Sequence, residues 1–279
     1  MSGEDMRKNY LEGTIDLHFH AGPDVRERKL TYLEAALQAR DAGMKAILIK
    51  SHSTITADIA SLIQPLVKDI LVFGGIALNY PLGGLNPAAV VTALRLGAKQ
   101  IWMPTLSAAN QYRHERKKGG ITILSRKGSL KKEVIEILEI LSRHDVILST
   151  GHLSQDEIIV LVKEAIKKKM KKILVTHPDH FFIQMPAEVQ KELAKEGLFF
   201  DRCFPTPTTS PLSMEEMAKR IREVGVASSV LTSDFGQPEN PLPVEGLRSY
   251  IQQFIQLGFS DQEIDQMVKI NPSKLLNLS

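Results

Sequence analysis

The sequence predicts a single (β/α)8 barrel, also called a TIM barrel, over residues 1–279. Short β-branched apolar runs alternate with amphipathic helical segments along the chain, a rhythm typical of βαβ units and a parallel sheet. Glycine follows several helical segments, as in "RDAGMKAILIK" and "REVGVASSVL", where it supplies the left-handed conformation that ends a helix. No glycine-rich phosphate loop follows the first apolar run, which disfavours an open dinucleotide-binding sheet.

Eight apolar runs are the predicted strands, and eight strand–helix units in 279 residues fit a closed barrel. The runs cover residues 14–20, 45–51, 70–78, 99–105, 146–152, 171–177, 198–204 and 227–234. Four helical segments begin with a capping box, a hydroxyl residue followed three positions later by glutamate. These pairs are Thr31 and Glu34, Ser154 and Glu157, Ser213 and Glu216, and Ser260 and Glu263, the last of which begins an extra C-terminal helix.

The interval between the fourth and fifth strands is too long for a simple connection. Residues 113–129 predict an inserted β-hairpin that turns near Gly119 and Gly120. An insertion at this point lies over the mouth of the barrel, so a lid is one interpretation. A hairpin without a function, or a contact in a homo-oligomer, is the alternative.

Composition and charge narrow the class of protein. The net charge of +3 is too small to indicate nucleic-acid binding, and no apolar run approaches the length of a membrane span. The single cysteine, Cys203, excludes an internal disulfide and is expected to pack as a small residue. We therefore expect a cytoplasmic protein with a small-molecule substrate, and the sequence leaves its oligomeric state open.

Five residues able to bind a metal lie at the ends of four of the apolar runs, the end of the strands where barrel enzymes build their sites. They are His18, His20, His152, His177 and Asp234. Side chains alternate across a strand, so the two histidines of "IDLHFH" share one face and can bind one ion together. Leu17 and Phe19 are then expected to pack outward on the helices. Asp16 is expected to orient an imidazole or to close a buried polar contact.

This pattern resembles the amidohydrolase superfamily of metal-dependent hydrolases. The HxH motif of the first strand, histidines after the fifth and sixth strands and an aspartate after the eighth match it, and the tail "NPSKLLNL" is similar to that family's ending. By this resemblance, His18, His20 and Asp234 hold the metal, with His152 or His177 as a further ligand. Asp234 would move the proton of metal-activated water, and His177 would polarise the substrate carbonyl.

The resemblance implies hydrolysis of a C–N or C–O bond in an amide, a lactone or an ester, or deamination of a ring. Zinc suits the ligands best, and Mn²⁺, Fe²⁺ or Co²⁺ are alternatives. Dinuclear members carry a bridging lysine carbamate or glutamate, usually at the end of strand four. The corresponding "IWMPTLSAAN" offers neither, so we expect one ion rather than two.

Lys50 is the third predicted catalytic residue. In "ILIKSH" it is expected to share the inward face with Leu48 and His52. There it could pair with a substrate anion, polarise a leaving group or carry a carbamate that bridges two ions. A lysine that extends to solvent from the strand end is the alternative. Candidate substrate-binding residues around the same mouth are His52, Asn79, His180 and Arg202.

Two other functions stay open. Non-hydrolytic lyases, such as decarboxylases, and isomerases of this superfamily use the same ligands, and Lys50 and Arg202 would suit a carboxylate substrate. A catalytically silent metal- or ligand-binding barrel is the other alternative, against which the complete ligand set argues. The polymerase-and-histidinol-phosphatase type of barrel also begins with HxH but ends with an Asp-x-His pair, which "SDFG" lacks.

Overall fold

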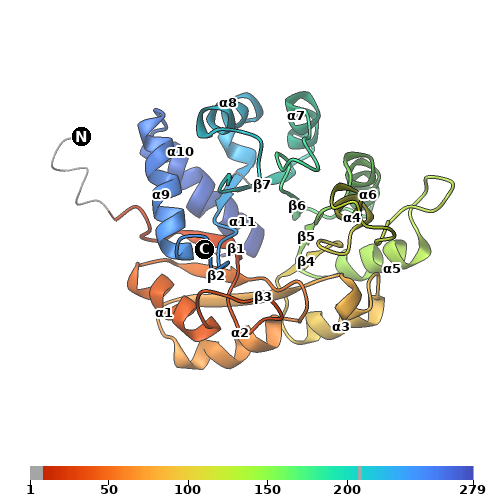
Figure 1. Ribbon diagram of the computed structural model, residues 1–279, viewed down its shortest axis with the longest axis horizontal. Coiled ribbons are helices and arrows are strands. Elements are labelled where there is room, and N and C mark those ends of the chain that lie inside the picture. The colour runs from red at the N-terminus through yellow and green to blue at the C-terminus, as the bar shows by residue number, and fades with distance from the viewer. Residues whose placement is uncertain (1–8, 207–208, 279) are drawn as a thin grey trace.

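Eight parallel strands, in the order β1 to β8, form the barrel, as the sequence predicts. The computed structural model describes residues 9–206 and 209–278, so the ends of the predicted domain and residues 207–208 lie outside the described residues. Helices follow one another around the strands in chain order (Figure 1). None of the helices in the described ranges combines the length and the apolar character that a bilayer-spanning segment needs.

Each strand lies within its predicted run. The strands are β1 Ile15–Phe19, β2 Ala46–Ile49, β3 Leu71–Ala77, β4 Gln100–Trp102, β5 Ile147–Ser149, β6 Ile173–Thr176, β7 Phe199–Cys203 and β8 Ser229–Thr232. Every strand pairs in parallel with the next, from β1 with β2 to β7 with β8. The predicted site residues therefore meet at the carboxyl end of one sheet.

Helical segments connect the strands along the chain. They are α1 Tyr32–Asp41, α2 Ala57–Ile63, α3 Pro87–Arg95, α4 Ala109–His114, α5 Lys132–Leu141, α6 Gln155–Lys167, α7 Ala187–Lys195, α8 Met214–Val224, α9 Pro243–Gln256, α10 Asp261–Asp265 and α11 Asn271–Leu276. Shorter helical turns are η1 Gln64–Leu66, η2 Tyr80–Leu82, η3 Val226–Ser228 and η4 Gln266–Ile270. All four capping boxes form, at the starts of α1, α6, α8 and α10.

Individual backbone hydrogen bonds join the end of β8 to the end of β1. The Asp234 amide donates to the His18 carbonyl at 2.9 Å, and the His20 amide donates to the Phe235 carbonyl at 2.9 Å. These bonds close the barrel at His18, His20 and Asp234, the three predicted primary metal ligands. The aspartate therefore lies beside both histidines although more than 200 positions separate them in the chain.

An irregularity in β1 changes the predicted pattern of inward and outward side chains. The Asp16 carboxylate accepts the backbone N–H of His18 at 3.0 Å and that of Ser233 at 3.3 Å, and the β1–β2 register shifts between Asp16 and Phe19. Phe19 packs outward, as predicted, but Leu17 belongs to the cluster inside the barrel. The prediction that Leu17 faces the helices is therefore wrong, and Asp16 closes a buried polar contact.

The interior of the barrel is filled below the site. Inward-facing apolar side chains from the strands pack with Leu275 and Leu276 of α11, and Trp102 lies among them with no exposed surface. The C-terminal helix lies next to the strands in Figure 1. The predicted extra C-terminal helix thus closes the amino-terminal end of the barrel, and the carboxyl end stays available for a site.

The insertion after β4 is not the predicted β-hairpin. It begins with helix α4 and continues as an irregular loop with isolated bridges, from Ala108 to Ile121 and from Leu124 to Leu130. The Glu157 carboxylate accepts the Ile123 amide at 3.0 Å and ties this loop to α6. Two isolated bridges and a side-chain contact with α6 therefore take the place of a regular hairpin ladder.

Candidate metal centre and active site

Three predicted ligands converge at the carboxyl end of the barrel. The Asp234 Oδ1 atom lies 3.0 Å from His18 Nε2 and 3.1 Å from His20 Nε2, and the side chains of both histidines are buried. His177 Nε2 lies 3.6 Å from Asp234 Oδ2, the other carboxylate oxygen. Two imidazole nitrogens and a carboxylate oxygen at this spacing are a donor set that zinc accepts.

Asp201, which the sequence analysis did not select, orients His18. Its Oδ2 atom lies 2.8 Å from His18 Nδ1, and its Oδ1 accepts the Thr232 hydroxyl at 2.6 Å. A hydrogen bond at Nδ1 orients Nε2 toward Asp234, and metal-binding histidines usually have such a partner at the other ring nitrogen. Strand alternation could have indicated Asp201. It lies two positions after Phe199 and shares its face, and the Phe199 ring packs against the cluster inside the barrel.

Two site residues have a backbone conformation that non-glycine residues rarely adopt. His177 has a φ of 49° and Asp234 a φ of 54°, each just beyond the end of its strand. A left-handed residue of this kind costs on the order of 1 kcal/mol, and such residues are enriched at functional sites. The two residues with this unfavourable conformation, His177 and Asp234, have side chains that face each other.

His152 lies farther around the mouth, next to His177, with 5.3 Å between the ring centroids. The Oε1 atom of Gln111, from α4, lies 3.1 Å from His152 Nδ1. His152 Nε2 is buried and has no partner among the described residues. His152 is in neither of the two described groups whose three ligand atoms lie within 4.8 Å of one another, so it is separate from the His18–His20–Asp234 group.

Lys50 points into the barrel, as the alternation of β2 predicts, and has no exposed surface. Its Nζ atom lies 2.8 Å from His18 Nε2 and 5.5 Å from the centre of the Trp102 ring. Burial lowers the pKa of Lys50, although the negative charge of Asp234 opposes this shift. The lysine is therefore not extended to solvent, and it reaches the same point as the predicted ligands.

Burial and neighbouring charges set the protonation of the centre. Burial disfavours a charged imidazole at His18, but the Asp234 and Asp201 carboxylates outweigh it and raise the pKa of His18 to about 9. Burial lowers the pKa of His20 to about 3 and that of His177 to about 4, so both rings are neutral. Burial opposes ionisation of Asp234, yet His18 and His20 hold its pKa well below the ordinary value. Asp234 is therefore a carboxylate that faces a protonated His18 and the two neutral imidazoles of His20 and His177.

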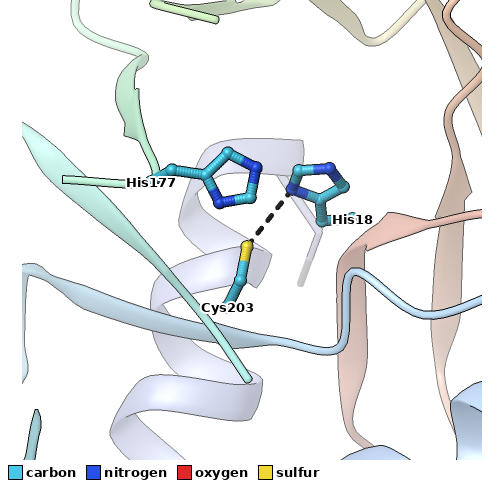
Figure 2. A group of neighbouring side chains, drawn as sticks. All are labelled: His18, His177 and Cys203. Atoms are coloured by element: carbon cyan, nitrogen blue, oxygen red, sulfur yellow. Dashed lines mark hydrogen bonds between the residues drawn. The ribbon is translucent and has the colours of Figure 1, made fainter. Parts of the chain in front are cut away.

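Cys203 faces His18 and His177 inside the barrel (Figure 2). Its Sγ atom lies 3.4 Å from His18 Nδ1, which already has the closer contact with Asp201. Burial, with the charge of Asp201, raises the pKa of the Cys203 thiol well above its ordinary value. A neutral thiol is a poor ligand and a poor nucleophile, which agrees with the expected packing role.

A cavity of about 320 Å³ opens above the centre. Leu106, Phe181 and Phe182 form an apolar part of its wall, and Arg26 and Glu115 lie on it as charged residues from two loops. Glu115 belongs to the insertion after β4, which therefore forms part of the wall. The remaining lining residues are His20, Lys50, His52, Gln111, His152, His177, His180, Thr209, Asp234 and Gln237.

Arg202 does not lie on this cavity. Its side chain is fully buried, pairs with Asp179 and packs over the Phe200 ring at 5.2 Å. Asp179 also accepts Arg220 of α8 at 3.1 Å, so the pair joins β7 to a surrounding helix. Arg202 lines a hollow of about 20 Å³, room for about one water molecule. The predicted substrate contact of Arg202 does not fit this position.

Asn79 is also engaged in structure rather than open to a ligand. Its Oδ1 atom accepts the amides of Thr105 and Ser107 at 2.9 and 3.0 Å. Its Nδ2 atom donates to the His52 carbonyl and to the Thr105 hydroxyl at 3.0 and 2.7 Å. All four hydrogen-bonding positions of the amide are occupied, so the predicted direct substrate contact of Asn79 does not fit.

His52 and His180 do line the cavity, as expected of substrate-binding residues. His52 stacks on His20 with 5.1 Å between ring centroids. His180 packs on Phe182 at 3.8 Å, and burial lowers its pKa to about 2. Both rings are neutral, because burial and the nearby Lys50 charge also lower the pKa of His52 well below its ordinary value.

Comparisons with known proteins agree with this fold. The sequence profile of a family described as a family of unknown function, DUF6282, matches residues 13–201. No curated protein sequence matches the chain.

Solved structures with the same fold include an amidohydrolase from Pseudomonas aeruginosa, at 13% identity and a TM-score of 0.66, with 96% of this chain and 97% of that one covered. A 2,6-dihydroxybenzoate decarboxylase from Rhizobium has 12% identity and a TM-score of 0.59, with 95% and 99% covered. A β-aspartyl dipeptidase from Fervidobacterium islandicum AW-1 has 16% identity and a TM-score of 0.62, with 96% and 75% covered. At these identities the likeness establishes the fold. The chain belongs to the family of unknown function DUF6282, and its barrel has the fold of amidohydrolase-superfamily enzymes.

Proposed function

We propose that this protein is a metal-dependent hydrolase that cleaves a C–N or C–O bond at a carbonyl-type carbon of a small molecule. The observation that carries the proposal is the convergence of two histidines on one carboxylate oxygen, Asp234 Oδ1, at 3.0 Å from His18 Nε2 and 3.1 Å from His20 Nε2, beside a cavity that His20 and Asp234 line. A cavity of about 320 Å³ is at the lower end of the range for small-molecule sites. A cytoplasmic location remains part of the proposal.

The donor atoms fit one divalent ion, most readily zinc. Imidazole and carboxylate ligands suit Zn²⁺, and Mn²⁺, Fe²⁺ and Co²⁺ accept the same set. The hydrogen bond from His18 Nδ1 to Asp201 and the strained backbone at Asp234 both favour a preformed centre. His177, whose Nε2 lies 3.6 Å from Asp234 Oδ2, is the best placed further ligand. The separation of His152 from this group favours one ion.

A divalent ion at this centre would supply a Lewis acid that lowers the pKa of water and polarises a carbonyl oxygen. Asp234 holds its ligand oxygen toward the two histidines, and its Oδ2 atom faces His177. This second oxygen can take a proton from the attacking water and return it to the leaving group. Lys50, buried beside His18, can donate a hydrogen bond to the negative charge that develops on the substrate oxygen. Phe181 and Phe182 exclude water from one side.

Decarboxylation is the second candidate. Lys50 and Arg26 place two cations on the cavity, which would suit a carboxylate substrate, and one solved structure with this fold is named a decarboxylase. The two reactions differ in the source of product oxygen, because hydrolysis alone adds an oxygen atom from solvent.

The test is turnover of a panel of amides, lactones, esters, aminated rings and aromatic carboxylates in ¹⁸O-labelled water. Zinc-loaded protein should release a product that carries the label, and protein stripped by a chelator should not. Release of carbon dioxide from an aromatic acid without label in the remaining product would favour the lyase. Tight zinc binding with no turnover across the panel would favour a silent metal-binding barrel.

A further inference from the structure

A chain of hydrogen bonds behind the cavity fixes the ring of His52. His52 Nδ1 lies 2.8 Å from the Thr105 hydroxyl, and Asn79 donates to that same hydroxyl at 2.7 Å. Asn79 has one orientation, because its Oδ1 atom accepts two backbone amides, those of Thr105 and Ser107. The Nδ2 atom of Asn79 is therefore the end that faces Thr105.

The single hydrogen of the Thr105 hydroxyl then determines the tautomer of His52. A hydroxyl group has one hydrogen to donate, and Thr105 is fully buried. In the described part of the chain, the only other polar atom beside this hydroxyl, apart from its Asn79 donor, is His52 Nδ1. If Nδ1 also donated, the hydroxyl hydrogen would be buried without an acceptor, which folded proteins avoid. Thr105 therefore donates to Nδ1, and the neutral ring carries its hydrogen on Nε2.

The Nε2 atom of His52 faces the cavity. It has no hydrogen-bond partner among residues 9–206 and 209–278, and it is not among the polar atoms that are sealed from solvent. His52 lines the cavity between His20 and His152, at ring-centroid distances of 5.1 and 6.2 Å.

His152 on the other side has the opposite arrangement. Gln111 donates its amide to Glu115, so its Oε1 atom accepts from His152 Nδ1, and His152 Nε2 keeps a lone pair. The two neutral rings are thus opposite tautomers: His52 has a hydrogen on an Nε2 atom that is not sealed from solvent, and His152 has a lone pair on a buried Nε2 atom. A ring with a hydrogen on the exposed nitrogen cannot ligate a metal through it. The two histidines therefore differ in role although both follow strands of one barrel.

We propose that His52 is a specificity-determining residue whose Nε2–H, set by Asn79 and Thr105, donates to a carbonyl or carboxylate oxygen of the substrate. The inference rests on the proposed function, because a substrate held at the metal centre is what would bring an acceptor oxygen to this side of the cavity. It excludes His52 from the metal ligands.

The experiment is ¹⁵N NMR spectroscopy of protein labelled at histidine, with the His52 signals assigned by their loss in His52→Gln. Wild type and Thr105→Ser, which keeps the hydroxyl, should show the Nε2–H tautomer. Thr105→Val, which removes the donor, should lose that preference. A wild-type His52 with its hydrogen on Nδ1, or bound to zinc through Nε2, would overturn the inference. The wild-type spectrum alone can overturn the inference, so the test does not depend on turnover or on whether Thr105→Val folds.

The substrate contact is tested with acetate as the probe on zinc-loaded protein. Acetate should shift the His52 Nε2–H signal, and His52→Ala should weaken acetate binding about tenfold with zinc stoichiometry unchanged. Equal acetate affinity in wild type and His52→Ala would overturn the contact. Failure of wild type to bind zinc would refute the proposed function instead, and the tautomer would still be measured on the metal-free protein.

Discussion

Replacement of Asp201 by asparagine tests whether a carboxylate prepares His18 to bind metal. In the structure, Asp201 Oδ2 accepts from His18 Nδ1 at 2.8 Å, and Oδ1 accepts the Thr232 hydroxyl at 2.6 Å. Asparagine has nearly the same shape but only one acceptor oxygen. If its amide nitrogen faces His18, the ring hydrogen must move to Nε2, the atom that is needed for the metal. If the nitrogen faces Thr232, His18 keeps its bond but loses the neighbouring negative charge.

Both orientations weaken the metal site. Mutation of such outer partners of metal-binding histidines typically lowers metal affinity 10- to 100-fold. This range corresponds to about 1.4–2.7 kcal/mol of binding free energy. Asp201→Asn should therefore raise the zinc dissociation constant by about one to two orders of magnitude while the protein stays folded.

Competition with a chromophoric chelator measures this change at fixed pH. The matched control is Asp265→Asn, the same substitution at a side chain that is 48% exposed and pairs with Lys269 at 2.8 Å on the outer surface. The control should bind zinc as the wild type does. Equal zinc affinity in the two variants would refute the reasoning, because Asp201 would then have no part in preparing His18.

Gly236→Ala would place a Cβ atom 2.0 Å from the His20 carbonyl oxygen at a φ of 137°. The free energy of unfolding, measured by thermal denaturation, should fall by about 1–3 kcal/mol, and zinc should bind more weakly. Gly97→Ala, with a φ of 90° and no atom within 4 Å, should cost less; equal losses would contradict the close approach at Gly236. Arg202→Met removes one partner of a buried ion pair, so the free energy of unfolding should fall by about 3–5 kcal/mol with zinc affinity unchanged. A stable Arg202→Met protein that loses turnover would instead support the substrate contact that its position argues against. Cys203 should resist iodoacetamide in the folded protein and react after denaturation, because its thiol is buried with a raised pKa; rapid labelling of native protein, followed by mass spectrometry, would count against this.

Strand periodicity made the barrel and most of the centre predictable. His20, Lys50 and Asp234 lie just after the ends of β1, β2 and β8, and the ends of parallel strands lie together. Capping boxes located helix starts because they depend on residues three positions apart, a range that a local pattern contains.

The errors arose where distant residues set the local structure. Leu17 faces inward because Asp16 binds the amide of Ser233, more than 200 positions away, and shifts the register of β1. In "DRCF" we expected Arg202 to face the site, whereas its neighbour Asp201 reaches the centre. Alternation separates these two residues onto opposite faces, but which face is inward depends on the neighbouring strands.

The hairpin prediction failed for a similar reason. Gly119 and Gly120 do adopt positive φ values of 88° and 89°, as a turn requires. However, Ile121, directly after them, pairs with Ala108, which lies before the predicted hairpin, rather than with residues 113–118. Side-chain contacts with α6 then hold the loop, and no local sequence signal indicates such partners.

X-ray diffraction from zinc-soaked crystals, with anomalous data collected on both sides of the zinc absorption edge, tests the central claim most directly. We predict one strong anomalous peak, bounded by His18 Nε2, His20 Nε2 and the Asp234 carboxylate. A peak at another position, or a well-ordered centre with no peak while zinc binds elsewhere on the chain, would contradict the account.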